Sequence, residues 1–574
     1  MMRCPLATTT LRSLGQRIGV GVGSLVLLLG LLIRPASVAA QALNNEELLK
    51  QAAACEKRHD WREACCLYDE LLHRRRDDAR LRQAYQRCLR CYRIVQRHQD
   101  KLYRTALERL TPAQALDLYV HVLETVDRVY TDRQKSSPAA LFAQGLEELR
   151  LAFEEPIFTH EYFPTVTQEQ LRSFRKKLDE WQQRKIANRS EAREQVGVIG
   201  RTAQQLCSGG QPIRLTVIVL EFLCGACNAL DEFTFFLTPG HYREVQAALR
   251  GRLVSIGVDL EVIDEQLVIR RVYPSSPAKD AGLKLYDRIV RIDGQSTREL
   301  TVERAAELLR GKAGTFVRLE IIPFDSVDLE IKFVAIKRAP VVAPSVEYGM
   351  DEPFEFELDN GMKAVFPVGR LTIHYFQEST LQEVKDALAT LQLAGMKVLI
   401  LDLRRNPGGL FRSAIEVAEL FLPEGIIVIS QTHAIKDRKL SGIIRADRRD
   451  AGPTEHPEAL LMPMVVLIDG ETASAAEVLA GALKDNGRAR LVGQPTFGKG
   501  TLQCVLPLDK PYFERMPAGI RITVAKLLSP HWQPYSGKGV EPHFRSFDSN
   551  DILLEARQFL LQELRRSLQA MSPD

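Results

Sequence analysis

The stretch Lys397–Leu422, KVLILDLRRNPGGLFRSAIEVAELFL, decides the fold class of this chain. An aliphatic run suited to a strand buried on both faces meets a turn at Gly408 and Gly409, and apolar residues at helical spacing follow. Strands that are apolar throughout and lead directly into helices are typical of a sheet covered by helices. The stretch therefore predicts an α/β unit.

The same pattern recurs further along the chain. The aliphatic run MVVLIDG (Met464–Gly470) is followed by ETAS and then by a helical segment, AAEVLAGALKDNG (Ala475–Gly487). Another short strand, ARLVG, precedes QPTFGKGTLQ (Gln494–Gln503). We therefore expect an α/β core over residues 345–547, followed by a C-terminal helix over residues 548–574.

Upstream, residues 249–338 predict a small β-rich domain. The segment SIGVDLEVIDEQLVIRRVYPSSPAKDAGL (Ser255–Leu283) holds two strand-like runs, a Pro-Ser-Ser-Pro corner and a short helix. A strand with an Asp-Gly turn, the amphipathic helix TVERAAELLRG and the strand TFVRLEII complete it. This order resembles a PDZ domain, and a small β-domain that binds nothing is the alternative.

The PDZ resemblance implies that the end of another chain is bound as an added strand. The terminal carboxylate would be held by backbone N–H groups of the loop that precedes the peptide-binding strand. The residues of that loop are Ser255, Ile256, Gly257 and Val258.

The first half of the chain is predicted to be mainly helical. Residues 43–100 resemble a tetratricopeptide helix pair followed by a third helix, and an ordinary helical hairpin is the alternative. Residues 101–248 continue as a helical region with a polar insertion near 155–210, in which Thr167 begins a capping box. The expected fold class is therefore multidomain α+β.

Residues 1–40 are typical of an export signal. Basic residues precede the apolar run VGVGSLVLLLGLLI (Val20–Ile33), and small residues with A-x-A-like cleavage sites follow it. The run is shorter than the ~20 apolar residues that a membrane-spanning helix needs. A cleaved signal peptide is therefore favoured over an uncleaved membrane anchor, and we expect a protein of the periplasm or cell envelope.

Composition and charge narrow the classes of function. Hydrophobic residues make up 45% and charged residues 26% of the 574 residues, a balance that suits several globular cores. The net charge of +4 gives no case for a nucleic-acid partner. The pairs Cys88/Cys91 and Cys224/Cys227 lie too far apart in sequence for a zinc ribbon. We therefore expect no metal and no cofactor, and buried thiols or disulfides at these positions.

The segment GQPTFGKGT (Gly493–Thr501) almost spells a phosphate-binding loop. Gly500 stands where that loop needs a hydroxyl, and the residues that follow favour a strand over the long helix that such a loop opens. A nucleotide site is therefore disfavoured. Lys499 can instead act as a general base for a serine, if burial or a positive neighbourhood lowers its pKa from about 10.4.

Two helix starts in the α/β core are candidates for an oxyanion site. Gly408 and Gly409 open one helix, and Ser474 begins the other. Helix N-termini present unpaired N–H groups and a partial positive charge, so two converging ends would stabilise a developing oxyanion. Each feature alone is ordinary, because serine is a frequent N-cap. A Ser–Lys pair needs no histidine, and the eleven histidines form no evident triad.

The stretch from about residue 220 to 545 resembles the C-terminal processing peptidases, also called tail-specific serine peptidases. The motifs occur in the family's order: LDEFTFFLTP, the PDZ-like domain, LILDLRRNPGG, VVLIDGETASAAEVLAGAL, LVGQPTFGKGTLQ and LLSPHWQPYSGKGVEP. The resemblance implies that Ser474 is the nucleophile, Lys499 its base and Gln503 a residue that assists the lysine. The spacing of 25 residues from Ser474 to Lys499 matches the family's. The core implied is an α/β serine peptidase with a crotonase-like sheet.

Two further expectations concern the oxyanion donors and the path of the chain between Lys499 and Gln503. The oxyanion donors that we infer are the backbone N–H groups of Gly408, Gly409 and Ala475. Gln503 follows Lys499 by four residues, which span about 13 Å in an extended strand, too far for a single site. We therefore predict a turn or bulge between them, which the glycines flanking Lys499 permit.

The expected activity is that of an exported serine endopeptidase. The PDZ domain would capture substrate C-termini, and Ser474 and Lys499 would cleave peptide bonds through an acyl-enzyme. Arg310, at the end of a PDZ helix, is a candidate for coupling peptide binding to assembly of the site, with a solvated helix-end charge as the alternative. The helical module at 43–100 lies outside the resemblance and is available to dock a partner protein.

Two other functions stay open at this point. The first is a catalytically silent adaptor of the cell envelope, which would bind through its PDZ domain and helical repeat. The second is a different acyl transfer on a crotonase-like core, a fold-level analogy only. The partners expected are proteins or peptides with accessible C-termini, no nucleic acid, and a membrane only if the signal segment stays uncleaved.

Overall fold

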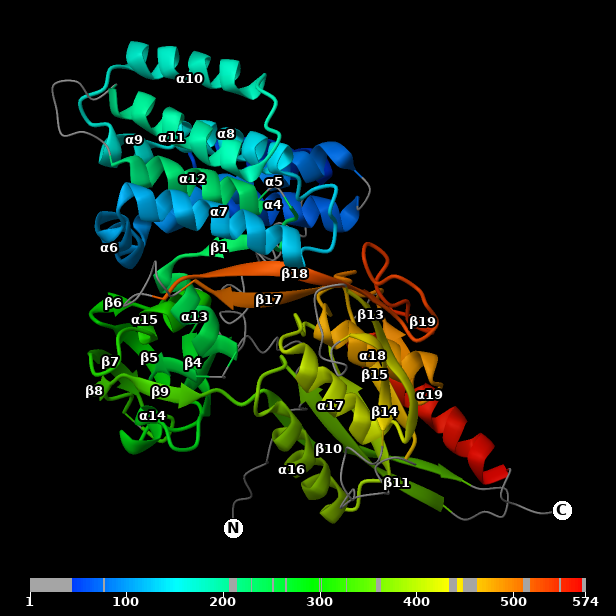
Figure 1. The fold of residues 1–574 in the computed structure, drawn as a ribbon. Helices are drawn as coiled ribbons and strands as arrows, with labels where there is room; N and C mark the ends of the chain where they lie inside the picture. The colour runs from blue at the N-terminus through cyan, green and yellow to red at the C-terminus, as the bar shows by residue number, and fades with distance from the viewer. Residues whose placement is uncertain are drawn as a thin grey trace.

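The computed structural model describes residues 44–569, apart from the segments 76–77, 206–213, 229, 250–251, 264–265, 299, 301, 327, 358–362, 433–440, 448–461, 509–516 and 547–548. The predicted signal segment, residues 1–40, lies outside the described residues. The described chain forms a helical domain, a small β-rich domain and an α/β core (Figure 1).

The helical domain comprises most of the described residues from 44 to 228. Its helices are α3 (Asn45–Lys57), α4 (Trp61–Arg74), α5 (Ala79–Gln99), α6 (Lys101–Arg109), α7 (Pro112–Val129), α8 (Pro138–Glu154), α9 (Pro156–Tyr162), α10 (Gln168–Gln182), α11 (Arg189–Gln205) and α12 (Leu215–Asn228). Side chains cap several of these helices at their starts. Thr111 and Thr167 each form a capping box with a glutamine three residues later, so the capping box predicted at Thr167 is confirmed.

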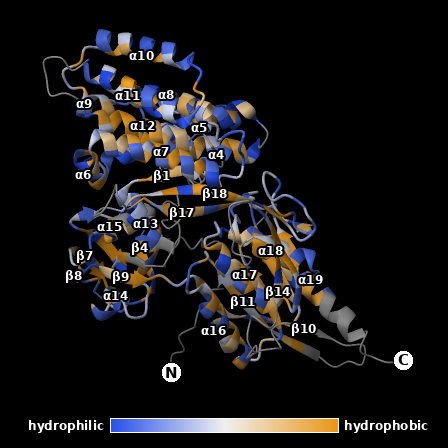
Figure 2. Cartoon of the chain, in the orientation of Figure 1, coloured by the Kyte–Doolittle hydropathy of each residue, from blue (hydrophilic) through white to orange (hydrophobic). Residues whose placement is uncertain are grey.

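Helix α12 lies at the centre of the helical domain. Every residue from Leu215 to Cys227 is buried, and Figure 2 shows the helix as almost uniformly hydrophobic. It approaches α8 closely, since a Cβ atom on Gly225 would lie only 2.7 Å from the Cα atom of Gly145. Buried side chains of α3, α4 and α5 belong to the same core. The helices of residues 43–100 therefore share one core with the rest of the domain.

The β-rich domain follows in the chain. Its main sheet has the strand order β3-β4-β5-β7-β8, with β6 paired to β5, while β2 and β9 form a separate pair. The elements are β2 (Arg252–Ser255), β3 (Val258–Ile263), β4 (Gln266–Val272), α14 (Pro277–Asp280), β5 (Arg288–Ile292), β6 (Gln295–Ser296), α15 (Val302–Leu309), β7 (Phe316–Ile322), β8 (Lys332–Lys337) and β9 (Ala339–Val342). Among the described strands, β3 pairs only with β4, so its outer edge is available for another strand.

The α/β core contains a sheet with the order β10-β11-β12-β15-β16-β19. Its strands are β10 (Val346–Glu357), β11 (Lys363–Ile373), β12 (Val398–Asp402), β15 (Met464–Ile468), β16 (Arg490–Gly493) and β19 (Phe544–Arg545). Strand β10 is antiparallel to β11, and the others pair in parallel. The helices around it are α16 (Thr380–Leu393), α17 (Phe411–Phe421), α18 (Ala475–Asp485) and α19 (Ser549–Gln569).

Side chains of this sheet alternate between two hydrophobic layers. Leu399 and Leu401 of β12 pack with α16, α17 and α18, whereas Val398 and Ile400 pack with α19. Helices thus cover both faces of the sheet, as the apolar strands predicted. The parallel order brings the ends of β12 and β15 side by side, with α17 and α18 starting beyond them.

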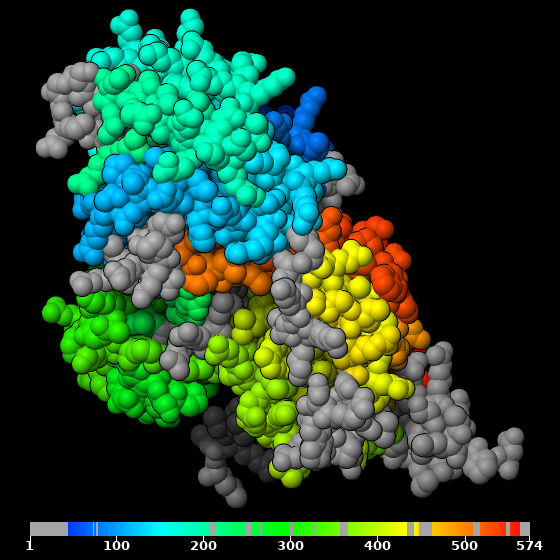
Figure 3. All heavy atoms as spheres, viewed as in Figure 1, coloured from blue at the N-terminus to red at the C-terminus, as the bar shows by residue number. Residues whose placement is uncertain are grey.

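A second sheet connects the helical domain to the α/β core. Its order is β1-β18-β13-β14, with β17 also paired to β18. The strands are β1 (Phe235–Leu237), β13 (Glu424–Gln431), β14 (Gly442–Asp447), β17 (Thr501–Pro507) and β18 (Gly519–Leu528), and α13 (Pro239–Leu249) follows β1. Ile520, Ile522 and Val524 of β18 lie in the core of the helical domain, and Leu527 lies in that of the α/β unit. Figure 3 shows the orange residues of this region between the blue-to-cyan helical domain and the green and yellow domains.

Candidate catalytic site

Ser474 occupies a strained turn between β15 and α18. Its backbone angles are φ 57° and ψ −115°, in the region that side-chain-bearing residues seldom adopt. Such a conformation costs about 1–3 kcal/mol and persists only where neighbours hold it. Here the N–H of Ala473 donates to the carbonyl oxygen of Asn406 at 2.8 Å, and Oγ1 of Thr472 donates to that of Leu403 at 2.9 Å. The loop after β12 therefore holds the serine turn in place.

The two glycines before α17 lie directly against the serine turn. A Cβ atom on Gly408 would be 2.7 Å from Cβ of Ser474 and 3.0 Å from the backbone nitrogen of Ala475. A Cβ atom on Gly409 would overlap the carbonyl oxygen of Phe376. Both glycines also have positive φ, 99° and 139°. The structure thus brings together the two helix starts that the sequence analysis singled out.

The inferred oxyanion donors differ in their present hydrogen bonds. The N–H of Gly408 donates to Oδ1 of Asn406 at 2.8 Å and is therefore already engaged. Within the described part of the chain, the backbone N–H groups of Gly409 and Ala475 donate to no acceptor. These two are the donors free to receive a developing oxyanion, and the catalytic role of all three stays a prediction.

Glu477 joins the serine turn to the lysine loop. Its carboxylate is fully buried and accepts hydrogen bonds from the N–H groups of Ser474 at 2.7 Å, Gly498 at 2.7 Å and Lys499 at 2.8 Å. The hydroxyl of Thr496 donates to it at 2.6 Å. Burial raises the pKa of Glu477, and these hydrogen bonds oppose that rise.

Glu477 is not among the predicted site residues, although its sequence position carries a signal. Ser474 and Glu477 stand in the S-x-x-E spacing of a capping box, in which the acidic side chain accepts from the N-cap N–H. The hydrogen bonds from Gly498 and Lys499 to Glu477 could not be predicted, because no local sequence pattern indicates them. One oxygen of Glu477, Oε2, accepts from both Ser474 and Lys499. The two backbone nitrogens therefore lie within the sum of two hydrogen-bond lengths.

Lys499 is buried in the manner that a lysine base requires. Its side chain is 8% exposed, and its Nζ lies 5.1 Å from the centre of the Phe233 ring. Burial, followed by the positive charge of Arg521, lowers the pKa of Lys499 well below its ordinary value, and Glu477, Glu232 and Asp231 oppose that shift. The amine is thus biased toward the neutral form that can accept a proton.

Ser474 and Lys499 are neighbours without a direct hydrogen bond. Among the interactions of the described residues, none joins Oγ of Ser474 to Nζ of Lys499. Catalytic hydrogen bonds are often long in a protein without substrate and tighten when the substrate is bound. The shared contact with Glu477 keeps the two residues close enough for such a rearrangement.

Gln503 lies beyond the predicted bulge. The register of β17 on β18 shifts between Leu502 and Gln503, so the strand is not straight after Lys499. The bulge that the spacing predicted is therefore confirmed. The amide nitrogen of Gln503 donates to the hydroxyls of Thr501 at 2.8 Å and Thr523 at 3.2 Å.

The carbonyl oxygen of the Gln503 side chain accepts from Arg521 at 3.4 Å. Within the described chain, no hydrogen bond connects Gln503 to Lys499. Arg521 is a link between the two residues, because it bonds Gln503 and its positive charge acts on the lysine amine. Its assisting role stays a prediction.

The predicted peptide-binding loop lies at the start of the open edge strand. Ser255 ends β2 and Val258 begins β3, with Ile256 fully buried between them. Gly257 has φ 82°, and a Cβ atom there would overlap Ser276, so only glycine fits. This turn places the loop beside an edge strand, the arrangement that β-strand addition needs.

Arg310 follows α15 and is half-buried between domains. Its positive charge acts on Glu244 of α13 and on Tyr375 of the α/β core. Tyr375 immediately precedes Phe376, whose backbone pairs with Gly409. Arg310 therefore lies where the β-rich domain reaches the loop of the inferred oxyanion donors.

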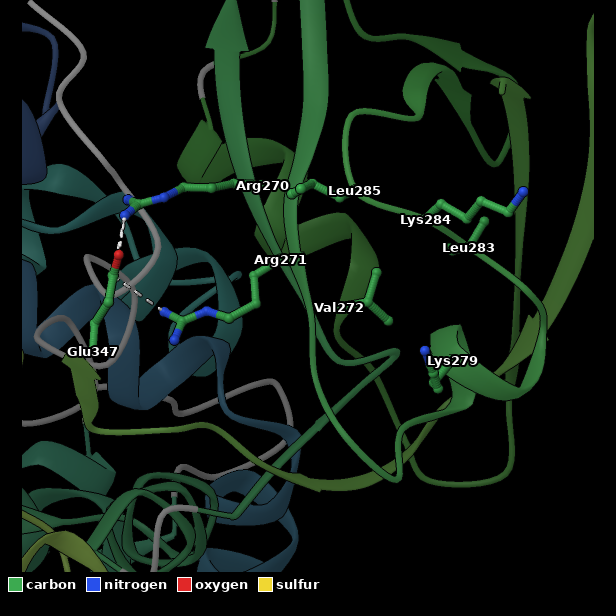
Figure 4. A pocket seen from close by; sticks show the side chains of 8 residues that line it. All are labelled: Arg270, Arg271, Val272, Lys279, Leu283, Lys284, Leu285 and Glu347. Atoms are coloured by element: carbon green, nitrogen blue, oxygen red, sulfur yellow. Dashed lines mark hydrogen bonds and ion pairs between the residues drawn. The ribbon is translucent and has the colours of Figure 1, made fainter. Parts of the chain in front are cut away.

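A cavity of about 540 Å³ lies where the β-rich domain meets the start of β10. Figure 4 shows Glu347 of β10 pointing toward Arg270 and Arg271 of β4. Its carboxylate accepts from Arg270 at 3.0 and 3.1 Å and contacts His374 at 3.3 Å. Ion pairs thus satisfy both arginines, and the cavity lies away from Ser474 and Lys499. The residues that line the cavity are Arg270, Arg271, Val272, Lys279, Leu283, Lys284, Leu285 and Glu347.

The described cysteines are thiols without disulfide bonds. They are Cys55, Cys65, Cys66, Cys88, Cys91, Cys224, Cys227 and Cys504, and all but Cys504 are buried. Cys4 and Cys207 lie outside the described residues. No group of three or more His, Cys, Asp or Glu side chains in the described chain could hold a metal ion. None of the helices in that part of the chain is both long and apolar enough to cross a membrane.

Two family models match the chain. The model described as peptidase family S41 matches residues 367–546, and the one described as PDZ domain matches residues 244–322. The chain is 35% identical over 316 residues to the carboxyl-terminal-processing protease of Synechocystis sp., which covers 54% of this chain and 67% of that protein.

The chain is also similar to a second curated protein and to a solved structure. The chain is 34% identical over 314 residues to the carboxyl-terminal-processing protease of Picosynechococcus sp., covering 54% of this chain and 69% of that protein. Among solved structures, it matches the photosystem II D1 C-terminal processing protease with a TM-score of 0.39 and 23% identity, over 77% of this chain and 96% of that one.

Proposed function

This chain belongs to the carboxyl-terminal-processing proteases of peptidase family S41, and from that premise we propose how its own residues carry out the reaction. It is a serine-type peptidase with a PDZ domain that binds peptide substrates. We propose that Ser474 is its nucleophile and Lys499 its general base. The observation that carries this assignment is the buried Glu477 carboxylate, which holds the backbones of both residues at once.

The first chemical step would be a proton transfer. Neutral Lys499 accepts the hydroxyl proton of Ser474, and the serine oxygen attacks the carbonyl carbon of a peptide bond. Negative charge then develops on the carbonyl oxygen. The N–H groups of Gly409 and Ala475, unengaged within the described chain, would receive it, and Gly408 would contribute if its bond to Asn406 is exchanged.

The second step releases the two products. The protonated amine of Lys499 returns its proton to the leaving nitrogen, so that the C-terminal fragment departs and an ester to Ser474 remains. The same lysine, neutral again, then activates a water molecule that hydrolyses the ester. Burial beside Phe233 and the charge of Arg521 favour the neutral amine at the start of both steps.

Substrate would reach this site through the PDZ domain. A chain end added to the free edge of β3 places its terminal carboxylate at the loop Ser255–Val258. Arg310 then lies between the occupied domain and the Tyr375–Phe376 segment that pairs with Gly409. We propose that Arg310 couples peptide capture to the geometry of the oxyanion donors.

The remaining proposals concern the rest of the chain. Export to a cell envelope is supported by the signal-like residues 1–40. A tetratricopeptide-like relationship is supported by the packing of α3 on α4 and by the full burial of Ala52 and Ala64, one on each helix. A crotonase-like relationship is supported by the parallel strands β11, β12, β15 and β16. A partner-docking role for residues 43–100 has less support, because their apolar side chains already pack in the domain core.

The proposed dyad is tested by incubating wild type and Ser474→Ala with an unstructured protein that has an apolar C-terminus. Ser413→Ala is the matched control, because Ser413 is a buried serine on the neighbouring α17. We expect cleavage by wild type and the control, and none by Ser474→Ala.

Lys499→Ala should be as inactive as the serine variant. Substantial residual cleavage by Lys499→Ala would contradict the dyad. Binding of the C-terminal peptide without Ser474-dependent cleavage would favour the adaptor function instead.

A further inference from the structure

The segment from Asp231 to Phe235 forms the cover of Lys499. Phe233 places its ring 5.1 Å from Nζ of the lysine. The next residue, Thr234, accepts a hydrogen bond from the N–H of Thr523 at 3.1 Å. Phe235 begins β1 and pairs in register with Arg521 of β18. The segment is thus built into the sheet that carries the surroundings of the lysine.

One side chain of the helical domain holds this segment at two points, Glu232 and Phe235, and also bonds the end of α12. Arg93 of α5 donates to the carbonyl oxygen of Glu232 at 2.6 Å and to Oδ1 of Asn228 at 3.0 Å. Its guanidinium carbon lies 4.4 Å from the centre of the Phe235 ring. The carbonyl bonded by Arg93 immediately precedes Phe233, so a movement of Arg93 would displace the ring that covers Lys499.

The charges around the lysine extend to the same arginine. The groups whose charge acts on Lys499 are Arg521 of β18, Glu477 of α18, and Asp231 and Glu232 of the covering segment. Arg93 in turn acts on Arg521 and on Glu232. The positive charge of Arg93 therefore adds to the field of Arg521, and its hydrogen bond fixes the backbone of Glu232.

We propose that Arg93 is a positioning residue for the catalytic lysine: it fixes the covering segment so that the ring of Phe233 excludes water from Lys499. The helical domain is thereby a working part of the active site, and its role extends beyond that of a separate module. This inference rests on the proposed role of Lys499 as the base. Arg93 contributes through the segment it holds and does not itself touch the substrate.

A purely structural anchor would behave differently from a positioning residue. Loss of an anchor would lower the folded fraction and reduce activity by the same factor at every pH. Loss of the cover would let water reach the amine, which favours the protonated form, and loss of the Arg93 charge acts in the same direction. The pH at which the base becomes active would therefore rise.

The experiment compares kcat/KM against pH for wild type, Arg93→Met and Arg90→Met. Arg90 lies on the same helix one turn earlier and is equally engaged, since it donates to Glu148 at 3.0 Å, but it makes no contact with residues 231–235 in the described chain. For Arg93→Met we expect the ascending limb of the kcat/KM profile to move to higher pH by about one unit. At a pH below that limb, kcat/KM would then be about tenfold lower than in wild type. For Arg90→Met we expect the wild-type limb with a similar loss of thermal stability.

Two outcomes would overturn the inference. One is a wild-type pH profile for folded Arg93→Met, and the other is an equal shift for Arg90→Met. Phe233→Leu keeps the inference falsifiable if Arg93→Met does not fold, because it opens the cover while the Arg93 side chain and its partners stay in place. It should reproduce the shift, and an unchanged limb would contradict the proposal. Arg93→Lys should restore the limb only in part, because an ammonium lacks the planar fork that bonds Glu232 and Asn228 together.

A readout that needs no peptidase activity separates this inference from the proposed function. In the Ser474→Ala background, a small acylating reagent labels Lys499 only in its neutral form, and mass spectrometry of the peptide containing it gives the labelling rate at each pH. The rate should rise through a higher pH in Ser474→Ala/Arg93→Met than in Ser474→Ala alone. The same labelling curve for both proteins would overturn the role of Arg93, whereas absence of cleavage by wild type would overturn the function alone.

Discussion

The two halves of the proposed dyad are built in different ways. The turn at Ser474 is made within the α/β core, by the ends of β12 and β15 and the loops that follow them. The surroundings of Lys499 come from three places: Glu477 of the core, Arg521 of the connecting sheet, and Phe233 at the end of the helical domain. A strained nucleophile can thus be made locally, whereas a neutral lysine needs more of the protein around it.

The largest expected effect on kcat/KM is that of replacing Ser474, the proposed nucleophile. Ser474→Ala should lower kcat/KM by at least about 1,000-fold, because no other group can form the ester. Ser474→Gly should be as inactive as Ser474→Ala. Its free energy of unfolding should be higher than that of Ser474→Ala by about 1 kcal/mol, because glycine adopts the positive φ without cost. Peptide cleavage and chemical denaturation measure the two effects. A Gly variant no more stable than the Ala variant would contradict the strain.

On the base side, Lys499→Met should remove activity to a similar extent. It should also raise the melting temperature, because the substitution removes a buried amine and keeps an unbranched apolar side chain. Lys484→Met is a matched control from α18, because Lys484 is partly exposed and its amine donates to the carbonyl oxygen of Glu541. That control should keep its activity. If Lys499→Met loses stability instead, the burial of a neutral amine is refuted.

Glu477→Gln breaks the contact that joins the two halves. An amide offers one acceptor oxygen where the carboxylate receives four donors, so at least one N–H group is left without a partner. We expect a loss of about 2 kcal/mol in stability and at least about a tenfold loss in kcat/KM. Parallel measurements of unfolding and cleavage test this, and unchanged activity would show that the shared carboxylate is dispensable.

The stability of the helical domain is expected to depend on pH through the buried carboxylate of Glu221. Burial alone would raise the pKa of Glu221, but Arg97 and His98 more than offset this and lower it to about 2. A depressed carboxylate pKa contributes stability above the ordinary value of 4.5, which is lost as pH falls toward 2. The contribution is at most about 3 kcal/mol, so Glu221→Gln should lose that amount at pH 7 and show a weaker pH dependence between 4.5 and 2.

Tryptophan fluorescence can follow this domain by itself. Two of the three tryptophans, Trp61 and Trp181, are buried in the helical domain, and the third is Trp532. In a Trp532→Phe background the signal reports the helical domain alone. Glu147→Gln, a half-exposed carboxylate on α8, is the control, and a pH dependence altered as strongly by it would contradict the role of Glu221.

The smallest expected effect is at the junction between the PDZ domain and the core. Glu347 is 41% exposed and pairs with Arg270, so the ion pair contributes less than about 1 kcal/mol after solvent screening. Glu347→Gln should change kcat/KM for a peptide with a free C-terminus by less than about threefold. A larger change would mean that this junction, rather than Arg310, carries the coupling between the domains.

The surroundings of Ser474 could be predicted from the sequence better than those of Lys499. Ser474 and the Gly408–Gly409 turn can be recognised from the local sequence, because in each case a strand, a turn of small residues and a helix follow one another. The bulge near Gln503 followed from spacing alone, because a straight strand could not return to Lys499. The S-x-x-E spacing at Glu477 was also present and could have been recognised.

The cover of the lysine had no such signal. Phe233 and Arg93 are far from Lys499 in sequence, and only the tertiary fold brings them together. Buried charges were equally hidden, since Arg97, Glu148 and Glu221 would each be placed on a helix surface by their residue type. The apolar run of α12 was the clue to a single core, because a helix that is hydrophobic on all sides must be surrounded.

The most direct test of the account is the pH dependence of Ser474 acylation by a small serine-directed reagent, followed by mass spectrometry of the intact protein. Such a reagent bypasses the PDZ domain and reports only the nucleophile and its base. We predict a rate that rises through a pKa well below the ordinary 10.5 of lysine and loses this limb in Lys499→Met. A rate that rises only near the ordinary lysine pKa, or an unchanged limb in Lys499→Met, would contradict the account.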